Sequence, residues 1–323
     1  MKAIRIHQFG PTEDVLQYED VPVPEPKVGE VLIKVEAASL NRADLGLRKG
    51  TYRISADALP LIPGREFAGT VEKLGAGVSE YQVGQGVVAY PSLGGYAEYA
   101  VAKTSDVRPI PDGVTSVQAA ATPTVFLTAW FGLLTDGDLK ADEWLLVQGG
   151  SSGVGNAAIQ IAKHLGAKVI TTSGSEEKCR RLRQLGADIT IDVSETDFMP
   201  EVMHVTKNRG VDVVLEMIGG EVFQKSLQAL APGGRLFSIG GAFGALPDPL
   251  PALSDGRKAT RFSITNYLKS KPEDFKRLDE ILKLVQEKKF QVIIGKTFPL
   301  AETRAAQRYL EGREHFGKIM LTM

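Results

Sequence analysis

A glycine-rich turn between two apolar segments is the part of the sequence best suited to bind a ligand. It runs from Gly149 to Gly155 and follows the apolar stretch Trp144–Val147. Apolar residues then recur at helical spacing as far as Gly166, where a helix would stop. Between a strand and a helix, backbone N–H groups of such a turn approach a pyrophosphate. We therefore expect a dinucleotide site rather than a plain structural turn, with these candidate contacts: Gly150, Ser152, Gly153, Val154 and Gly155.

The end of the next apolar strand, Lys168–Thr172, indicates which dinucleotide binds. A site for NAD usually has Asp or Glu there, which holds the 2′-hydroxyl of the ribose. Here the strand leads into Ser173-Gly174-Ser175, and no carboxylate occurs before Glu176. Small residues leave room for a 2′-phosphate, and Lys178 can supply positive charge. The sequence favours NADPH, although Lys178 and the arginines after it could form only the solvated face of a helix.

Composition limits the class of protein. The chain has 323 residues, of which 43% are hydrophobic and 24% charged, as in a globular protein of two domains. A net charge of −1 gives no reason to expect nucleic acid as a partner. No apolar run is long enough to span a membrane. The single cysteine, Cys179, cannot form an internal disulfide, which fits a reducing cytoplasm.

The pattern of strands and helices changes near residue 142. Before it, short strands alternate with Pro and Gly, which is typical of an all-β barrel. After it, strands near 144–148, 168–172, 188–192, 211–215 and 235–239 alternate with helical segments, which predicts a doubly wound parallel sheet. The last strands, Val292–Phe298 and Lys318–Thr322, return to the first pattern. We expect one domain from 1–122 and 266–323 and another from 123–265.

Several motifs together carry a resemblance to a known family. They are Asn41-Arg42-Ala43-Asp44, Pro63–Val71, Gly75–Val78, the turn through Gly155, Ser173–Ser175 with Lys178, and Gly317-Lys318-Ile319. Through them the chain resembles, over essentially its whole length, the zinc-free quinone oxidoreductases of the medium-chain dehydrogenase/reductase superfamily. The resemblance implies a GroES-like β-barrel catalytic domain and a Rossmann domain, with NADPH in the cleft. It also implies a homodimer joined through the cofactor domains.

The resemblance also implies roles for individual residues. Asn41, Asp44 and Tyr52 would line the substrate cleft, where Asn41 could donate to a carbonyl and Tyr52 could stack on a ring or donate a proton. The alternatives are helix capping by Asn41 and Asp44, and a surface loop position for Tyr52. Further cofactor contacts would come from Thr128, Ile218, Gly240, Gly241 and Lys318, although the two glycines could also form an ordinary turn. Gly46 and Val193 stand where several family members have tyrosine.

The residue types argue against a zinc site. Zinc needs three or four converging Cys, His or carboxylate ligands, whereas one cysteine and four histidines are scattered here without ligand spacing. Where zinc-dependent relatives have a ligand in Gly-His-Glu, this chain has Gly64-Arg65-Glu66. Arginine does not ligate zinc, so we expect no metal. Arg65 either stabilises a developing oxyanion or pairs with Glu66 or Asp44.

A metal-free site suits an acceptor that is already electron-poor. We therefore expect hydride transfer from NADPH to quinones or α,β-unsaturated carbonyls, with the protein supplying orientation, a dry pocket and hydrogen bonds to the oxyanion. One alternative is a 2-enoyl thioester reductase of the same superfamily, for which Tyr52 is the obvious acid. Another is a non-catalytic, nucleotide-binding structural protein.

Overall fold

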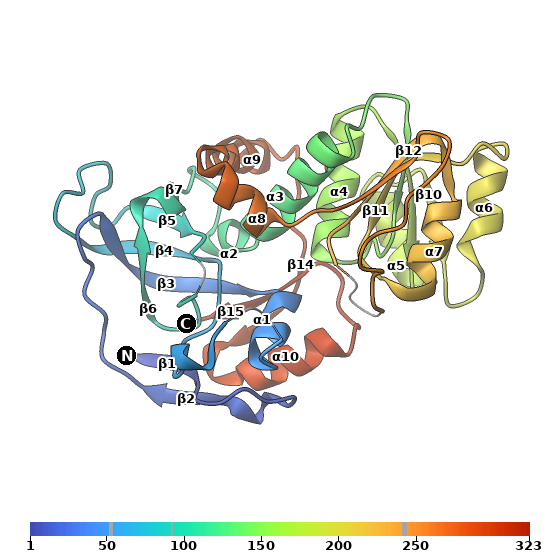
Figure 1. The fold of residues 1–323 in the computed structure, drawn as a ribbon. Coiled ribbons are helices and arrows are strands. Elements are labelled where there is room, and N and C mark those ends of the chain that lie inside the picture. Colours follow the sequence, from blue (N-terminus) through green and yellow to red (C-terminus); the bar gives the residue numbers. More distant parts are fainter. Residues whose placement is uncertain (52–53, 92, 241–243) are drawn as a thin grey trace. The chain divides into compact units, whose positions relative to one another are not determined.

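The computed structural model describes residues 1–51, 54–91, 93–240 and 244–323 (Figure 1). The chain forms two compact units: unit 1 comprises Met1–Pro123 and Phe275–Met323, and unit 2 comprises Thr124–Asp274. The expected second boundary, residue 266, falls inside α8 (Ile264–Ser270), a helix of unit 2. None of the helices in the described ranges is long and apolar enough to cross a membrane.

Unit 1 is built on a seven-stranded sheet whose central strand is β3 (Glu30–Leu40). The strand order is β14-β15-β3-β4-β5-β7, and β6 also pairs with β3. Alternate residues of β3, such as Val31, Ile33 and Val35, enter one apolar core, as the two-residue period of a strand requires. The other strands are β4 (Phe67–Leu74), β5 (Gly86–Ala89), β6 (Tyr99–Lys103), β7 (Val107–Pro109), β14 (Ile294–Pro299) and β15 (Lys318–Thr322).

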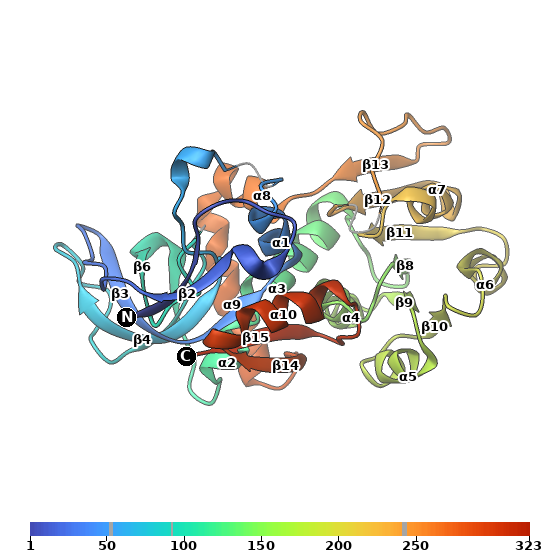
Figure 2. The same cartoon turned by 90° about the horizontal axis from the view of Figure 1, so that it is seen from below.

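A hairpin and several helices complete unit 1. The hairpin consists of β1 (Lys2–Ile6) and β2 (Leu16–Asp20), which pair antiparallel. The helices are α1 (Arg42–Arg48), α2 (Ser116–Ala120), α9 (Arg277–Gln286) and α10 (Thr303–Glu311). Both chain ends lie in this unit, as Figures 1 and 2 show.

The C-terminal strand brings distant residues of unit 1 together. β15 pairs antiparallel with β3, with Ile319 opposite Leu40, and β14 runs parallel to β15. Lys318, the residue before Ile319, therefore lies where β3 leads through Asn41 into α1. This pairing fixes the position of Lys318 within unit 1.

Unit 2 contains a six-stranded sheet in which all paired neighbours are parallel. The strand order is β10-β9-β8-β11-β12-β13. Counted from β8, this is the order 3-2-1-4-5-6 of dinucleotide-binding sheets, and ligands bind outside the carboxyl ends of such strands where the order reverses. That reversal lies between β8 and β11. The strands are β8 (Trp144–Val147), β9 (Lys168–Ser173), β10 (Ile189–Asp192), β11 (Val211–Glu216), β12 (Leu230–Ser238) and β13 (Lys258–Arg261).

Helices connect the strands of unit 2 and cover the sheet. Two of them, α6 and α7, lie next to each other in Figure 1 and share one apolar core with Leu146, Ile170 and Val214 of the sheet. Besides α8, the helices are α3 (Pro123–Phe131), α4 (Gly153–His164), α5 (Glu176–Gln184), α6 (Phe198–Val205) and α7 (Gly220–Gln228).

The edge strand β13 was not predicted from the sequence, because Lys258-Ala259-Thr260-Arg261 holds a single apolar residue.

Candidate functional site

The glycine turn of unit 2 lies between β8 and α4, and close backbone approach explains two of its glycines. A Cβ added at Gly150 would lie 2.1 Å from Oγ1 of Thr171. One added at Gly155 would lie 2.6 Å from the carbonyl oxygen of Gly149. The Gly150 N–H donates to the carbonyl of Thr172 at 2.9 Å, which holds the turn against the end of β9. Side chains at 150 or 155 would force the turn open.

Ser152, in the place of the middle glycine, is the N-cap of α4. Its hydroxyl oxygen accepts a hydrogen bond from the Gly155 N–H at 3.0 Å. The N–H groups of the first helical turn have no acceptor within the helix, so those of Gly153 and Val154 point out of the helix N-terminus. Such a helix end attracts an anion through these donors and through the helix dipole. The serine thus serves the turn structurally and leaves two N–H groups for a phosphate.

The end of β9 carries an orphaned polar group. The Ser173 side chain is 3% exposed, and its hydroxyl has no hydrogen-bond partner among the described residues. Beside it, a Cβ added at Gly174 would meet no atom within 4 Å, so space is open there. A buried hydroxyl without a partner next to open space fits an oxygen-rich ligand group such as a 2′-phosphate.

The two residues predicted to accompany Ser173 lie at the start of α5. Ser175 is its N-cap and accepts a hydrogen bond from the Lys178 N–H at 3.3 Å. Lys178 is half-buried in the first helical turn. Val193 lies beside Ser173, because its N–H donates to the Ser173 carbonyl at 2.9 Å, and its side chain is exposed. Cap formation is therefore the observed role of the Ser175 hydroxyl.

The loop after β11 meets the glycine turn where the strand order reverses. The Ser152 hydroxyl donates to Sδ of Met217 at 3.2 Å. A Cβ added at Gly149 would lie 3.2 Å from Cδ1 of Ile218. The structure thus brings Ile218 to the predicted pyrophosphate turn, as expected of a crevice at this position.

Three further residues of unit 2 were predicted to contact the cofactor: Thr128, Gly240 and Gly241. Gly240 follows β12 with φ of +134°, and a Cβ there would meet no atom within 4 Å. Thr128 lies buried in α3. Gly241 lies outside the described residues.

A buried polar cluster in unit 1 joins Asn41, Glu66 and Lys318. Nζ of Lys318 donates to Oε1 of Glu66 at 2.8 Å, to Oδ1 of Asn41 at 2.8 Å and to the carbonyl of Leu40 at 2.9 Å. Oε1 of Glu66 also accepts from Nδ2 of Asn41 at 2.8 Å and from the Ser39 hydroxyl. Glu66 is fully buried and Lys318 is 5% exposed. This is an ion pair with its hydrogen-bonding capacity largely satisfied.

The hydrogen bonds of this cluster determine which donors remain available to a ligand. An ammonium carries three hydrogens, so these three bonds use all the donors of Lys318, which was expected to contact the nucleotide. Lys318 can only donate and the Glu66 carboxylate can only accept, which fixes the orientation of the Asn41 amide. Nδ2 of Asn41 carries a second hydrogen that no hydrogen bond within the described residues uses. Asn41 can therefore donate to a carbonyl.

Asp44 lies next to this cluster and is also buried. Its Oδ2 accepts from the Asn41 N–H at 2.7 Å, which caps α1, and from the Tyr96 hydroxyl at 2.8 Å. Burial raises the pKa of Asp44, although the Asn41 N–H and the positive charge of Arg65 oppose this rise. Burial and the Asp44 carboxylate raise the pKa of Tyr96 well above its usual value. Tyr96 therefore stays protonated and serves as a donor to Asp44.

Arg65 is half-buried and acts electrostatically on the Asp44 carboxyl. The Glu66 carboxylate, the other partner considered for Arg65, forms an ion pair with Lys318. Pairing of Arg65 with Asp44 or with Glu66 stays a prediction. Tyr52, the remaining predicted catalytic residue, lies outside the described residues.

Sequence reasoning missed Ser39, Tyr96 and the structural role of Glu66. A signal for Tyr96 exists at Gly64, which has φ of +93° and where an added Cβ would lie 2.4 Å from the Tyr96 ring. That contact joins residues far apart in the chain, so the sequence alone does not reveal it. Glu66 had a clearer signal, because a charged residue directly before the buried strand β4 needs a partner.

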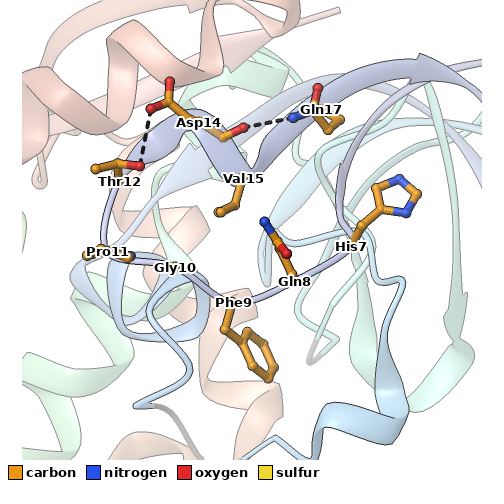
Figure 3. A pocket seen from close by; sticks show the side chains of 9 residues that line it. All are labelled: His7, Gln8, Phe9, Gly10, Pro11, Thr12, Asp14, Val15 and Gln17. Carbon is orange, nitrogen blue, oxygen red and sulfur yellow. Dashed lines mark hydrogen bonds between the residues drawn. The ribbon is translucent and has the colours of Figure 1, made fainter.

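A surface hollow of about 430 Å³ lies elsewhere in unit 1 and contains none of the predicted site residues (Figure 3). It is formed by the segment between β1 and β2, with exposed His7 and Gln17 at its rim. Asp14 makes hydrogen bonds with Thr12 and Gln17 there, at 3.2 and 2.7 Å. Most residues that line this hollow are exposed, whereas those of the Asn41 cluster are buried.

No group of three or more His, Cys, Asp or Glu side chains within the described ranges could hold a metal ion. Cys179 is buried, and burial raises the pKa of its thiol, which disfavours the thiolate that metals bind. Independence from zinc stays a prediction for the active enzyme.

The first testable consequence concerns the buried ion pair. Lys318→Met should lower the free energy of unfolding by about 3–5 kcal/mol, because Glu66 would remain as an unpaired buried charge. Urea denaturation followed by circular dichroism measures this. The double variant Glu66→Gln/Lys318→Met should recover part of the loss. Lys225→Met, which breaks ion pairs with the more exposed Asp197 and Glu221, should cost less than about 1 kcal/mol. Equal small losses in both variants would contradict the interpretation.

Comparison with known proteins agrees with this architecture. Residues 27–112 match the family model of the alcohol dehydrogenase GroES-like domain, and residues 153–287 match that of the zinc-binding dehydrogenases. The quinone oxidoreductase of Rattus norvegicus is 32% identical over 326 residues, covering 100% of this chain and 98% of that protein.

Solved structures give the same result. The Escherichia coli quinone oxidoreductase complexed with NADPH has a TM-score of 0.91 and 28% identity, with full coverage of both chains. The CurK enoyl reductase has a TM-score of 0.89 and 29% identity, covering 100% of this chain and 99% of that one. These findings confirm the expected combination of a GroES-like and a Rossmann domain. The chain belongs to the quinone oxidoreductase family of the medium-chain dehydrogenase/reductase superfamily.

Proposed function

We propose that this oxidoreductase transfers hydride from NADPH to quinones or α,β-unsaturated carbonyls without a metal. Unit 2 is the cofactor domain and unit 1 the catalytic domain. The observation that carries the proposal is the buried Asn41 amide, whose orientation Lys318 and Glu66 fix and whose second N–H remains available. A donor held in place before the reaction is what an oxyanion needs as hydride arrives.

The carboxyl ends of the strands in unit 2 fit NADPH. The N–H groups of Gly153 and Val154 would bind its pyrophosphate, and the Ser173 hydroxyl and the Lys178 ammonium its 2′-phosphate. Gly174 and Gly240 provide open space, and Ile218 lies beside the glycine turn. When bound, the cofactor supplies the hydride. This chain then needs to orient the acceptor, exclude water and stabilise negative charge on oxygen.

Residues of unit 1 would orient the acceptor and stabilise the negative charge on its oxygen. Asn41 donates to the carbonyl oxygen of the acceptor, and Arg65 contributes positive charge close by. Asp44 holds the start of α1 through the Asn41 N–H and acts as a positioning group. Tyr52 remains the candidate that donates a proton or stacks on a flat substrate ring. Gly46, in place of a second cleft tyrosine, would widen the pocket.

A second candidate function is reduction of 2-enoyl thioesters, favoured by the likeness to the CurK enoyl reductase. Such a substrate is also a conjugated carbonyl, so the same Asn41 donor would serve it. A non-catalytic nucleotide-binding role is the third candidate, and turnover of any acceptor would exclude it.

We also propose a cytoplasmic homodimer joined through the cofactor domains. β13 supports this arrangement, because it pairs with β12 on one side and forms an edge of the sheet. An edge strand presents unpaired backbone groups that a second chain can cover. Mass measurement in solution should then give about twice the 34.9 kDa of one chain.

A screen of acceptors tests the proposed function. Oxidation of NADPH, followed by its absorbance, should occur with quinones or with enones and enals, and extensive chelation should leave the rate unchanged. Faster turnover of enoyl thioesters than of every quinone and enone would select the second candidate. Activity that depends on a stoichiometric bound zinc would contradict the metal-free mechanism.

Cofactor preference gives a second test. Lys178→Ala should weaken NADPH binding by about 1–3 kcal/mol, the range for loss of a charge-assisted hydrogen bond, and barely change NADH binding. Calorimetric titration with each cofactor measures both affinities. Lys168→Ala is the matched control, since Lys168 is exposed at the amino end of β9. Equal losses for NADPH and NADH would show that Lys178 does not discriminate between them.

The third test separates the roles of Asn41 and Arg65. Asn41→Ala should lower kcat about 100-fold, as expected for loss of an oxyanion donor. Arg65→Met should lower kcat with little change in melting temperature if its charge acts on the oxyanion. A lower melting temperature with normal activity in the folded fraction would instead assign Arg65 to structural pairing with Asp44.

A further inference from the structure

Glu216 is a buried carboxylate that the proposed chemistry does not use. It is the last residue of β11, on the strand where the order of the unit 2 sheet reverses, and it is fully buried. A buried charge is costly unless hydrogen bonds satisfy it. Its position at the carboxyl end of the strand places it on the ligand side of the sheet.

The Glu216 side chain binds the loop that follows it. Oε1 accepts hydrogen bonds from the N–H groups of Ile218 at 2.7 Å and Gly219 at 2.8 Å. Gly219 has φ of +84°, a left-handed conformation that glycine adopts without strain. The carboxylate therefore fixes the path of the chain through Ile218, the residue beside the glycine turn.

The other carboxylate oxygen binds the next strand. Oε2 accepts from the Ser238 hydroxyl at 3.2 Å, and the Gly240 N–H donates to the same hydroxyl at 3.4 Å. The backbone carbonyl of Glu216 accepts from the Ile239 N–H at 3.0 Å. One side chain thus connects the segments after β11 and β12, which form the second half of the dinucleotide-binding sheet.

These two segments correspond to the half of such a sheet that binds the second nucleotide. The first half, with β8 and β9, holds the pyrophosphate turn and the Ser173 site. Removal of the Glu216 carboxylate would free three donors, the Ile218 and Gly219 N–H groups and the Ser238 hydroxyl, all of them in the second half. Binding would then have to order both segments, at a cost in affinity.

We propose that Glu216 is a positioning residue that holds residues 217–219 and 238–240 as one preformed wall for the nicotinamide half of the cofactor. The inference rests on the proposed NADPH function and adds a residue to it. Burial raises the pKa of Glu216, but the Ile218 and Gly219 N–H groups oppose this rise and favour the charged form.

Two ligands separate this role from a general effect on folding. NADPH contacts both halves of the site, whereas adenosine 2′,5′-bisphosphate lacks the nicotinamide and reports on the first half alone. In calorimetric titrations, Glu216→Ala should raise the Kd for NADPH about tenfold or more, as expected for loss of charge-assisted hydrogen bonds. The Kd for adenosine 2′,5′-bisphosphate should stay within about twofold of wild type.

Glu216→Gln provides a conservative variant in case the alanine variant does not fold. Its amide oxygen can still accept from Ile218 and Gly219, so the Kd for NADPH should rise less, by about threefold. Asp212→Ala is the matched control. Asp212 lies on the same strand at its amino end and accepts from the Trp144 N–H at 2.8 Å, so its loss should lower the melting temperature and leave both Kd values unchanged.

The outcomes are distinct. Weakened NADPH binding with unchanged bisphosphate binding in the Glu216 variants supports the proposal. Equal weakening of both ligands, or of neither, overturns it. Failure of the wild-type protein to bind NADPH would instead remove the proposed function itself.

Discussion

The ion pair between Glu66 and Lys318 is the interaction on which unit 1 depends. It joins the segment before β4 to the first residue of the last strand, and both side chains are almost fully buried. Two charges removed from water are tolerated only where further hydrogen bonds satisfy them. Ser39, Asn41 and the Leu40 carbonyl supply those bonds, so β15, the end of β3 and the start of α1 must occupy fixed relative positions.

The fixed positions of these groups determine the orientation of the Asn41 amide. Amide side chains on a surface rotate freely, and their donor end has no fixed direction. Here an ammonium binds the oxygen and a carboxylate binds one N–H, so the energy of the ion pair also fixes the remaining donor. Lys318, a residue near the C-terminus, therefore fixes the orientation of an amide that lies at the start of α1.

The sequence predicted those parts of the fold and site whose causes are local. The glycine turn, the Ser173-Gly174-Ser175 segment and the parallel strands follow from spacing within a few dozen residues, and the family resemblance supplied the domain types. Contacts between Lys318 and Glu66, or between Gly64 and the Tyr96 ring, depend on how distant segments pack, which no local pattern records. β13 was missed because its pairing with β12, rather than an apolar pattern, makes it a strand.

Each unit contains a fully buried glutamate whose charge is satisfied by hydrogen bonds, but the donors differ between the two units. Glu66 is satisfied mainly by side chains from distant segments, so it holds the tertiary arrangement of unit 1. Glu216 is satisfied by N–H groups two and three residues further along and by a serine on the neighbouring strand, so it shapes loops within unit 2. In each case the cost of burying the charge forces neighbouring donors into one geometry. Preformed donors and loops lower the ordering cost of ligand binding, because their geometry is already fixed before the ligand arrives.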